Sequence, residues 1–243
     1  MASEQQERNY VAELESANQL LAAISASISH DLRSPLHTIT GFCELYLHEF
    51  GPSVSEEGRK LLDRVLEGTH RMDRLLEDLQ RFFRLGRQEL TKCPVPLDLI
   101  VRRVLRSLQA ESGGGRVSLQ IGSLPECEAD PSLIEQVWVN LLGNALKFSR
   151  HRNPAIVEVG CLDTPAEWVL FVRDNGAGFD DHYSSKLFGL FQRLHSAAEF
   201  EGSGVGLSTV RQIVTRHGGR VWAEGEVDKG AAFFFSLPRG SVV

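Results

Sequence analysis

Residues 14–46 read "LESANQLLAAISASISHDLRSPLHTITGFCELY" and decide how the first part of the chain folds. Apolar residues recur there at alternating steps of three and four: Leu14, Ala17, Leu21, Ile24 and Ile28. This is the heptad spacing of a helix that packs along another helix. The proline at position 35 removes one backbone N–H, so we expect a kink nearby. The stretch predicts one long helix with an apolar stripe.

A second helical stretch follows the breaker Gly51-Pro52, and we expect it to begin at a capping box formed by Ser53 and Glu56. Two apolar rows with seven-residue spacing run along it: Leu62, Thr69, Leu76 and Phe83, and beside them Val65, Met72 and Leu79. A lone hairpin of two helices would leave much of these stripes in water. We therefore predict a homodimer in which two hairpins form a four-helix bundle. The alternative is a hairpin that packs on the rest of its own chain.

The heptads stop at Gly86, and Pro94 and Pro96 follow, so we place a domain boundary between residues 1–90 and 91–243. Beyond it the pattern alternates between helices and strands. We expect helices over 97–111, 131–148 and 204–219, and strands over 116–122, 155–162, 167–174, 220–227 and 231–238. The predicted fold class is α+β, a helical hairpin followed by an α/β sandwich with helices on one face of a mixed sheet.

The composition of the chain disfavours several kinds of protein and site. The 243 residues carry a net charge of −6, which disfavours a broad nucleic-acid surface. The four cysteines form no CxxC pair, so we expect reduced thiols rather than disulfides or a metal site. No apolar run approaches the roughly 20 residues needed to span a bilayer, and the polar amino terminus is not a signal peptide. We expect a cytoplasmic protein with no membrane span in this chain.

Three polar side chains of the predicted helix 131–148 fall on one face. Asn140, Asn144 and Lys147 are four and three residues apart, in the stretch "NLLGNALKF". An amide oxygen is a hard ligand suited to Mg²⁺, and a lysine neutralises phosphate charge. The pattern favours a phosphate–Mg²⁺ site with Asn144 as the metal ligand. The alternative is an amphipathic helix with a solvated polar face.

Two glycine segments add to this pattern. In "VRDNGAGFD", residues 172–180, Asp174 ends a strand and could accept the exocyclic amine of adenine, while Gly176 and Gly178 would allow backbone close to a planar ring. A plain glycine turn is the alternative. In "EGSGVGLSTV", residues 201–210, a glycine-rich loop with Gly202, Gly204 and Gly206 precedes a helix. The N-terminus of that helix could bind phosphate. Each motif is weak alone, but the three in this order predict a nucleotide site.

Five stretches together resemble the motifs of a sensor histidine kinase core: "SHDLRSPL", "NLLGNALKF", "DNGAGF", "KLFGLFQRLH" and "GSGVGLSTV". The resemblance covers the chain from about residue 14 to 238. It implies a dimerising phosphoacceptor hairpin followed by an ATP-binding domain of the Bergerat type, the fold shared with gyrase. Within the family, the carboxy-terminal part is most similar to bacteriophytochrome-like kinases.

The resemblance also implies roles for single residues. His30 would be the phosphoacceptor, and Asp31 would assist it as a base. Ser34 stands where Thr or Asn is frequent in kinases that also act as phosphatases, so it puts phosphatase activity in doubt. Phe188 and Arg193 would belong to the lid over ATP. The nucleotide and Mg²⁺ would be held by the residues of the three motifs above.

The activity that follows is ATP-dependent autophosphorylation of His30 and transfer of the phosphoryl group to an aspartate of a response regulator receiver domain. A net phosphatase toward that regulator is one alternative. A non-catalytic dimeric scaffold with a vestigial ATP site is another. An upstream sensor domain would belong to such a protein, and none lies within these 243 residues.

Overall fold

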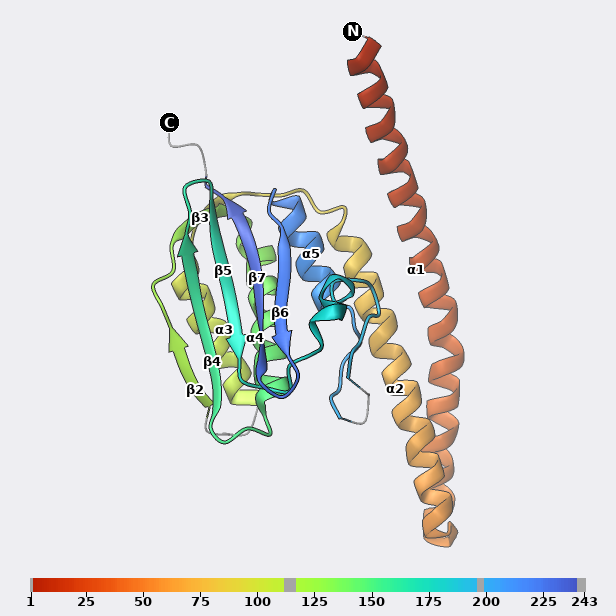
Figure 1. The fold of residues 1–243 in the computed structure, drawn as a ribbon. Coiled ribbons are helices and arrows are strands. Elements are labelled where there is room, and N and C mark those ends of the chain that lie inside the picture. Colours follow the sequence, from red (N-terminus) through yellow and green to blue (C-terminus); the bar gives the residue numbers. More distant parts are fainter. Residues whose placement is uncertain (1, 112–116, 196–198, 240–243) are drawn as a thin grey trace. The chain divides into compact units, whose positions relative to one another are not determined.

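The computed structural model describes residues 2–111, 117–195 and 199–239. The chain divides between Gln88 and Glu89 into two compact units, a helical one and one built on a sheet (Figure 1).

The first unit is a helical hairpin of α1 (Ala2–Phe50) and α2 (Glu56–Leu85), joined through the 3-10 turn η1 (Gly51–Ser53). Helix α1 continues through Pro35. Two polar contacts set the register of the two helices. Arg33 Nε donates to Asp73 Oδ1 at 3.2 Å, and Thr40 Oγ1 donates to Thr69 Oγ1 at 3.1 Å.

The expected capping box at the start of α2 is wrong by two residues. Ser55 is the N-cap, and its Oγ accepts a hydrogen bond from Gly58 N at 3.1 Å. Ser53 closes the preceding 3-10 turn instead, because its Oγ donates to Phe50 O at 2.8 Å. Val54 and Ser55 are extended, so the helix can begin only at Glu56.

One face of the hairpin remains apolar and exposed. On α2, Val65 and Met72 keep more than 40% of their surface exposed. On α1, several large apolar residues are at least 42% exposed: Ile24, Ile28, Leu32, Ile39, Phe42, Leu45, Tyr46 and Phe50. Within one protomer, these residues are therefore not covered by the contact between the two helices.

The second unit contains a five-stranded mixed sheet with helices on one face (Figure 1). The strand order is β2 (Val117–Ile121), β4 (Ala155–Asp163), β5 (Glu167–Asp174), β7 (Gly230–Pro238) and β6 (Val221–Glu226). Only the β2–β4 pair is parallel. The covering helices are α3 (Leu97–Glu111), α4 (Pro131–Ser149) and α5 (Gly206–Arg216). These elements confirm the helices and strands expected from the sequence.

The core lies between this sheet and the helices. Trp138 of α4 and Phe235 of β7 are fully buried and meet edge to face, with ring centroids 5.2 Å apart. Asp130 begins α4 as its N-cap, because its side chain accepts hydrogen bonds from Ser132 N and Leu133 N. This cap fixes where the polar face of α4 starts.

Three short elements were not predicted. Strands β1 (Cys93–Pro96) and β3 (Glu126–Ala129) form a separate antiparallel pair, and η2 (Asp181–Lys186) is a 3-10 turn. Strand β1 contains Pro94 and Pro96, which are typical of a linker in the sequence. Proline is tolerated there because a two-stranded ribbon leaves one edge of each strand without ladder bonds.

Candidate functional site

His30 lies on an exposed face of α1. Its side chain is 86% exposed, and its Nδ1 lies 3.2 Å from Asp31 Oδ1. The preceding residue, Ser29, is fully buried, so the side of α1 that contacts α2 is turned away from the imidazole. Ser34, one helical turn further on, is also exposed. The imidazole can therefore be reached by a group from outside the hairpin.

The polar face of α4 brings three of the predicted residues together. Asn140, Asn144 and Lys147 are all half-buried. Lys147 Nζ donates to Asn144 Oδ1 at 3.2 Å. Asn140 Nδ2 donates to the carbonyl of Gln136 in its own helix at 2.8 Å, which leaves its side-chain oxygen directed elsewhere. The face presents an ammonium and two amide oxygens.

Lys147 sits among other cations. Burial lowers the pKa of its ammonium to about 8, and the nearby Arg193 and Arg150 act in the same direction. The Nζ atom lies 4.2 Å from the centroid of the Phe148 ring, which favours the charged form only weakly. Three cations close together, two of them half-buried, form a strong site for an anion such as a polyphosphate.

Asp174 occupies the end of β5 and is buried, with 5% of its surface exposed. Burial raises the pKa of its carboxyl to about 6, although hydrogen bonds from the backbone of Gly176 and Ala231 oppose the shift. Gly176 N donates to Asp174 Oδ1 at 2.8 Å. A buried carboxylate whose oxygens can accept further hydrogen bonds is suited to bind an amine group of a ligand.

The first glycine segment needs its glycines for packing against α4 and the β6–β7 turn. A Cβ on Gly176 would lie 2.5 Å from the carbonyl oxygen of Phe148. Gly178 has a φ of +64°, and a Cβ there would meet the carbonyl oxygen of Glu226. A side chain at Gly176 would push this turn away from the end of α4, and one at Gly178 would push it away from the β6–β7 turn.

The second glycine segment lies against the polar face of α4. A Cβ on Gly206 would come 2.6 Å from Asn140 Oδ1, and one on Gly202 would come 3.4 Å from Lys147 Nζ. Gly204, with a φ of +76°, packs against the backbone of Phe191. Helix α5 begins at Gly206, so its free N–H groups point toward the same cluster.

Arg193 holds the loop that precedes this segment. It donates to Gly202 O at 2.8 Å and to Phe200 O at 2.7 Å. His195 Nε2 lies 2.9 Å from Gly178 O, and the ring of His195 contacts Phe200. These contacts join the two glycine segments through side chains of the segment between them.

Several residues of the site were missed by the sequence reasoning. Phe148 and Phe200 form an aromatic contact with ring centroids 4.8 Å apart, and Arg150 donates to Glu199 O at 2.6 Å. Arg152 donates to Gly176 O at 3.0 Å and to Asp228 O at 2.7 Å, and so ties the first glycine turn to the β6–β7 turn. Phe148 and Arg150 closely follow Lys147 on the chain, which is the one signal that could have found them.

Phe188 does not join this cluster. Its ring is buried and lines a separate cavity between η2, α5 and β6. The remaining predicted residues of the second unit, from Asn140 to Gly206, gather at the carboxy-terminal end of α4 and the start of α5. The phosphoacceptor candidate lies in the other unit.

Two protein families match this chain. Residues 12–88 match the His Kinase A (phospho-acceptor) domain, and residues 129–241 match the histidine kinase-, DNA gyrase B- and HSP90-like ATPase. The first match contains His30, and the second contains the cluster around Lys147.

The chain belongs to the histidine kinase family. It is 35% identical to cyanobacterial phytochrome B of Nostoc sp. over 228 residues, which cover 93% of this chain and 30% of the relative. It is 36% identical to the methanogenesis regulatory histidine kinase FilI of Methanothrix harundinacea, over 97% of this chain and 26% of the relative. This histidine kinase chain thus spans less than a third of the length of these relatives.

Among solved structures, this kinase chain is similar to full-length ShkA in complex with AMPPNP. The TM-score is 0.62 at 26% identity, over 90% of this chain and 46% of ShkA. The helical part followed by a mixed-sheet domain, and the histidine kinase transmitter domains predicted from the sequence, are confirmed. Within the described part of the kinase, no helix combines the length and the hydropathy that crossing a membrane requires.

Proposed function

We propose that this histidine kinase chain uses ATP to phosphorylate His30 and then passes the phosphoryl group to an aspartate of a response regulator receiver domain. The observation that carries the proposal is the group of cations around Lys147, which faces the amide oxygens of Asn140 and Asn144 and the glycine segment that begins α5. The exposed imidazole of His30 beside Asp31 supplies the acceptor.

The residues present fit a nucleotide with Mg²⁺. Lys147, with Arg193 and Arg150 near it, would neutralise the phosphates, and Asn140 would lie beside them. Asn144 would hold Mg²⁺ through its side-chain oxygen, and the ion supplies charge neutralisation on the phosphate oxygens when bound. The similar ShkA protein was solved in complex with AMPPNP, which supports a nucleotide ligand for this chain as well.

The remaining residues of the site would shape the nucleotide pocket. Asp174 would accept the adenine amine, and the positive end of α5 would face the phosphates. Arg193 would hold the lid, while Phe188 would support it from the separate cavity. The glycines would keep the backbone close to the ligand: Gly176, Gly178, Gly202, Gly204 and Gly206.

The hydrogen bond between His30 and Asp31 defines the chemistry at the acceptor. When Nδ1–H donates to the Asp31 carboxylate, the lone pair of the ring lies on Nε2. Nε2 would attack the γ-phosphorus, a new N–P bond would form, and the P–O bond to ADP would break. Asp31 would stabilise the positive ring or accept its Nδ1 proton. Lys147 would stabilise the charge left on ADP.

Two copies of the chain would form the active dimer. The exposed apolar residues of α1 and α2 give a long stripe that a second hairpin can cover, as in four-helix bundles. Replacing Phe42, which is 68% exposed, with Glu should shift the kinase from twice the 27.0 kDa protomer mass toward one protomer. Light scattering after size-exclusion chromatography measures this, with the exposed Glu44→Gln as the matched control. A dimer that survives Phe42→Glu would contradict the proposed stripe.

Autophosphorylation is tested by incubating the chain with γ-labelled ATP and Mg²⁺. The expected label is acid-labile and base-stable, and it is lost in His30→Gln. His37→Gln is the matched control, because His37 is an exposed histidine two turns further along the same helix. Equal labelling of His30→Gln and wild type would reject His30 as the acceptor.

Transfer is tested by adding a purified receiver domain to the labelled kinase. The label should move to that domain, and a label that stays on the kinase would reject that regulator as partner.

A further inference from the structure

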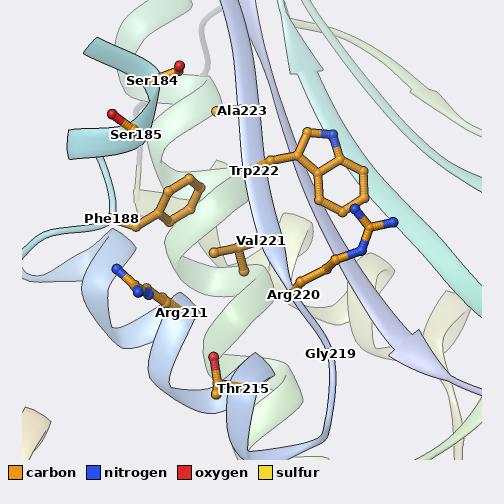
Figure 2. A pocket seen from close by; sticks show the side chains of 10 residues that line it. All are labelled: Ser184, Ser185, Phe188, Arg211, Thr215, Gly219, Arg220, Val221, Trp222 and Ala223. Carbon is orange, nitrogen blue, oxygen red and sulfur yellow. The ribbon is translucent and has the colours of Figure 1, made fainter.

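A cavity lies apart from the cluster around Lys147. It has a volume of about 440 Å³ and lies between η2, α5 and the edge strand β6 (Figure 2). Ligand pockets for small molecules usually measure about 300–1,000 Å³. Six side chains characterise its wall: Ser184, Ser185, Phe188, Arg211, Thr215 and Val221.

The polar part of this wall offers hydrogen-bond donors and no carboxylate. Arg211 and Thr215 lie one turn apart on α5, and Figure 2 shows both on the same side of β6 as Phe188. Arg211 is exposed, and no acidic side chain of the described residues pairs with it. Ser184 and Ser185 add hydroxyl groups from η2. A wall of this kind attracts an anion.

The edge of β6 adds backbone donors. Ser236 N donates to Arg220 O at 2.9 Å, so the backbone groups of Arg220 point toward β7. In an antiparallel ladder this direction alternates along the strand. The N–H groups of Val221 and Ala223 therefore point away from β7, to the free edge that lines the cavity.

The rest of the wall is apolar. Phe188 is 6% exposed, and Val221 is half-buried on the same side of the strand. The side chains of Trp222 and Arg220 point to the other side of β6 (Figure 2), where Trp222 stacks on Phe234 with ring centroids 5.2 Å apart. The cavity is too large for a phosphate or carboxylate alone, so its apolar wall would contact an organic group.

The cavity is distinct from the proposed nucleotide site. Val221 pairs with Phe235, whereas Asp174 pairs with Ala231 at the other end of β7. Four residues of extended strand separate these positions by roughly 13 Å. On α5, the cavity uses Arg211 and Thr215 in the second half of the helix, and the glycine segment precedes its first turn.

We propose that this cavity is a binding site for a small organic anion, in which Arg211 and the edge N–H groups of β6 bind a phosphate or carboxylate group and Phe188 contacts the apolar part. The proposal does not depend on ATP binding by the Lys147 cluster.

The experiment titrates the full chain with phenyl phosphate, with benzoate and with inorganic phosphate, and follows backbone amides by transverse-relaxation-optimised NMR. Saturating ADP and Mg²⁺ are present in one arm to occupy the proposed nucleotide site. We expect shifts at Val221, Ala223 and Thr215 in both arms. Removing the charge-assisted bond in Arg211→Ala should weaken binding about tenfold or more. Arg106→Ala, at an exposed arginine of α3, is the matched control.

The outcomes separate the sources of the anion. Tighter binding of phenyl phosphate than of benzoate would show that the site prefers a phosphate ester. Tighter binding of benzoate would show that it prefers a carboxylate. Equal affinity for inorganic phosphate would overturn the role of the apolar wall. Shifts confined to residues around Asn144 and lost with ADP would overturn the second site and leave the nucleotide site intact. Failure of ADP to bind, with Arg211-dependent shifts retained, would instead reject the nucleotide proposal alone.

Discussion

Nδ1 of His30 lies 3.2 Å from Oδ1 of Asp31, and both side chains remain exposed on α1. This contact orients the imidazole so that the lone pair lies on Nε2, which is directed away from the carboxylate. We therefore predict that the phosphoryl group is attached to Nε2 of His30. Mass spectrometry and ³¹P NMR of the phosphorylated chain distinguish the two nitrogens, and a phosphoryl group on Nδ1 would contradict the orientation.

Replacing Asp31 with Asn should slow autophosphorylation about 10²-fold, since positioned acid–base groups contribute about 10²–10⁴-fold. The ATP affinity should be unchanged, because Asp31 lies in the helical unit and the nucleotide cluster lies in the other. Single-turnover rates and calorimetry measure the two quantities. Asp63→Asn, at an exposed aspartate of α2, is the control. A parallel loss of ATP affinity would show that the variant disturbs more than the acceptor.

Lys147 should take up protons when ATP binds at pH 8. Burial, with Arg193 and Arg150 nearby, lowers the pKa of its ammonium to about 8, so about half of the molecules are neutral at that pH. Phosphate beside Nζ would raise the pKa again, and binding would take up about half a proton per site. Calorimetry in buffers of different ionisation enthalpy measures this number. Lys147→Arg should bind ATP with no uptake, and uptake that persists in that variant would assign it to another group.

Asp174 should lower the free energy of unfolding of the nucleotide-free kinase at neutral pH. Burial raises the pKa of its carboxyl to about 6, above the unfolded value near 3.9. The folded state then holds the proton more tightly, so this group's stabilisation is complete below about pH 4 and is lost as the pH rises through about 6. Asp174→Asn copies the protonated form. It should raise the free energy of unfolding by about 3 kcal/mol at pH 7 and by little at pH 4.

Urea unfolding of Asp174→Asn and wild type between pH 4 and pH 7.5 measures this difference. Asp181→Asn, at an exposed aspartate of η2, should show no such pH-dependent gain. The same Asp174 variant should lose ATP affinity, because an amide in place of the carboxylate presents one acceptor oxygen and a donor. A variant that is both less stable at pH 7 and unaffected in ATP affinity would reject the proposed role.

Much of the fold follows from local sequence signals. Asp130 before Pro131 predicts the start of α4, because an N-cap and a first-turn proline act within one turn. The alternation over residues 167–174 predicts one strand for a similar reason, and the apolar run over residues 231–238 predicts another. The spacing of Asn140, Asn144 and Lys147 also determines their common helix face without any long-range information.

Contacts between distant residues could not be predicted in this way. Cys93 of β1 pairs with Ala129 of β3, and neither four-residue strand is long enough to show a pattern. The contact of Phe148 with Phe200 and the bonds of Arg152 to Asp228 arise only after the chain has folded. Ser53 and Ser55 are both possible caps by sequence, and the choice depends on the 3-10 turn before them.

The surroundings of His217 also depend on contacts between distant residues. A lone histidine before a glycine pair is typical of an exposed helix end, yet His217 is buried, with 2% of its surface exposed. Its Nε2 accepts a hydrogen bond from Asp130 N at 3.0 Å, and its Nδ1 donates to Ile213 O at 2.8 Å. One nitrogen must accept, so this geometry requires the neutral ring. Burial lowers the pKa of His217 in agreement, and Lys92 and Arg216 add to the shift, whereas the Ile213 carbonyl and Asp130 oppose it.

Because the unfolded chain binds a proton at His217 near pH 6.5 and the folded chain resists it, stability should fall as the pH drops below about 6.5. Part of this fall should be absent in His217→Gln, whose side chain does not titrate. At pH 7, His217→Ala should cost about 1–3 kcal/mol, since the amide of Asp130 would be left without its acceptor. Urea unfolding between pH 5 and pH 8 measures both effects, with the exposed His182→Gln as the control. If His217→Gln follows the wild-type pH profile throughout, the acid sensitivity arises elsewhere and the neutral ring is not what couples the start of α4 to the end of α5.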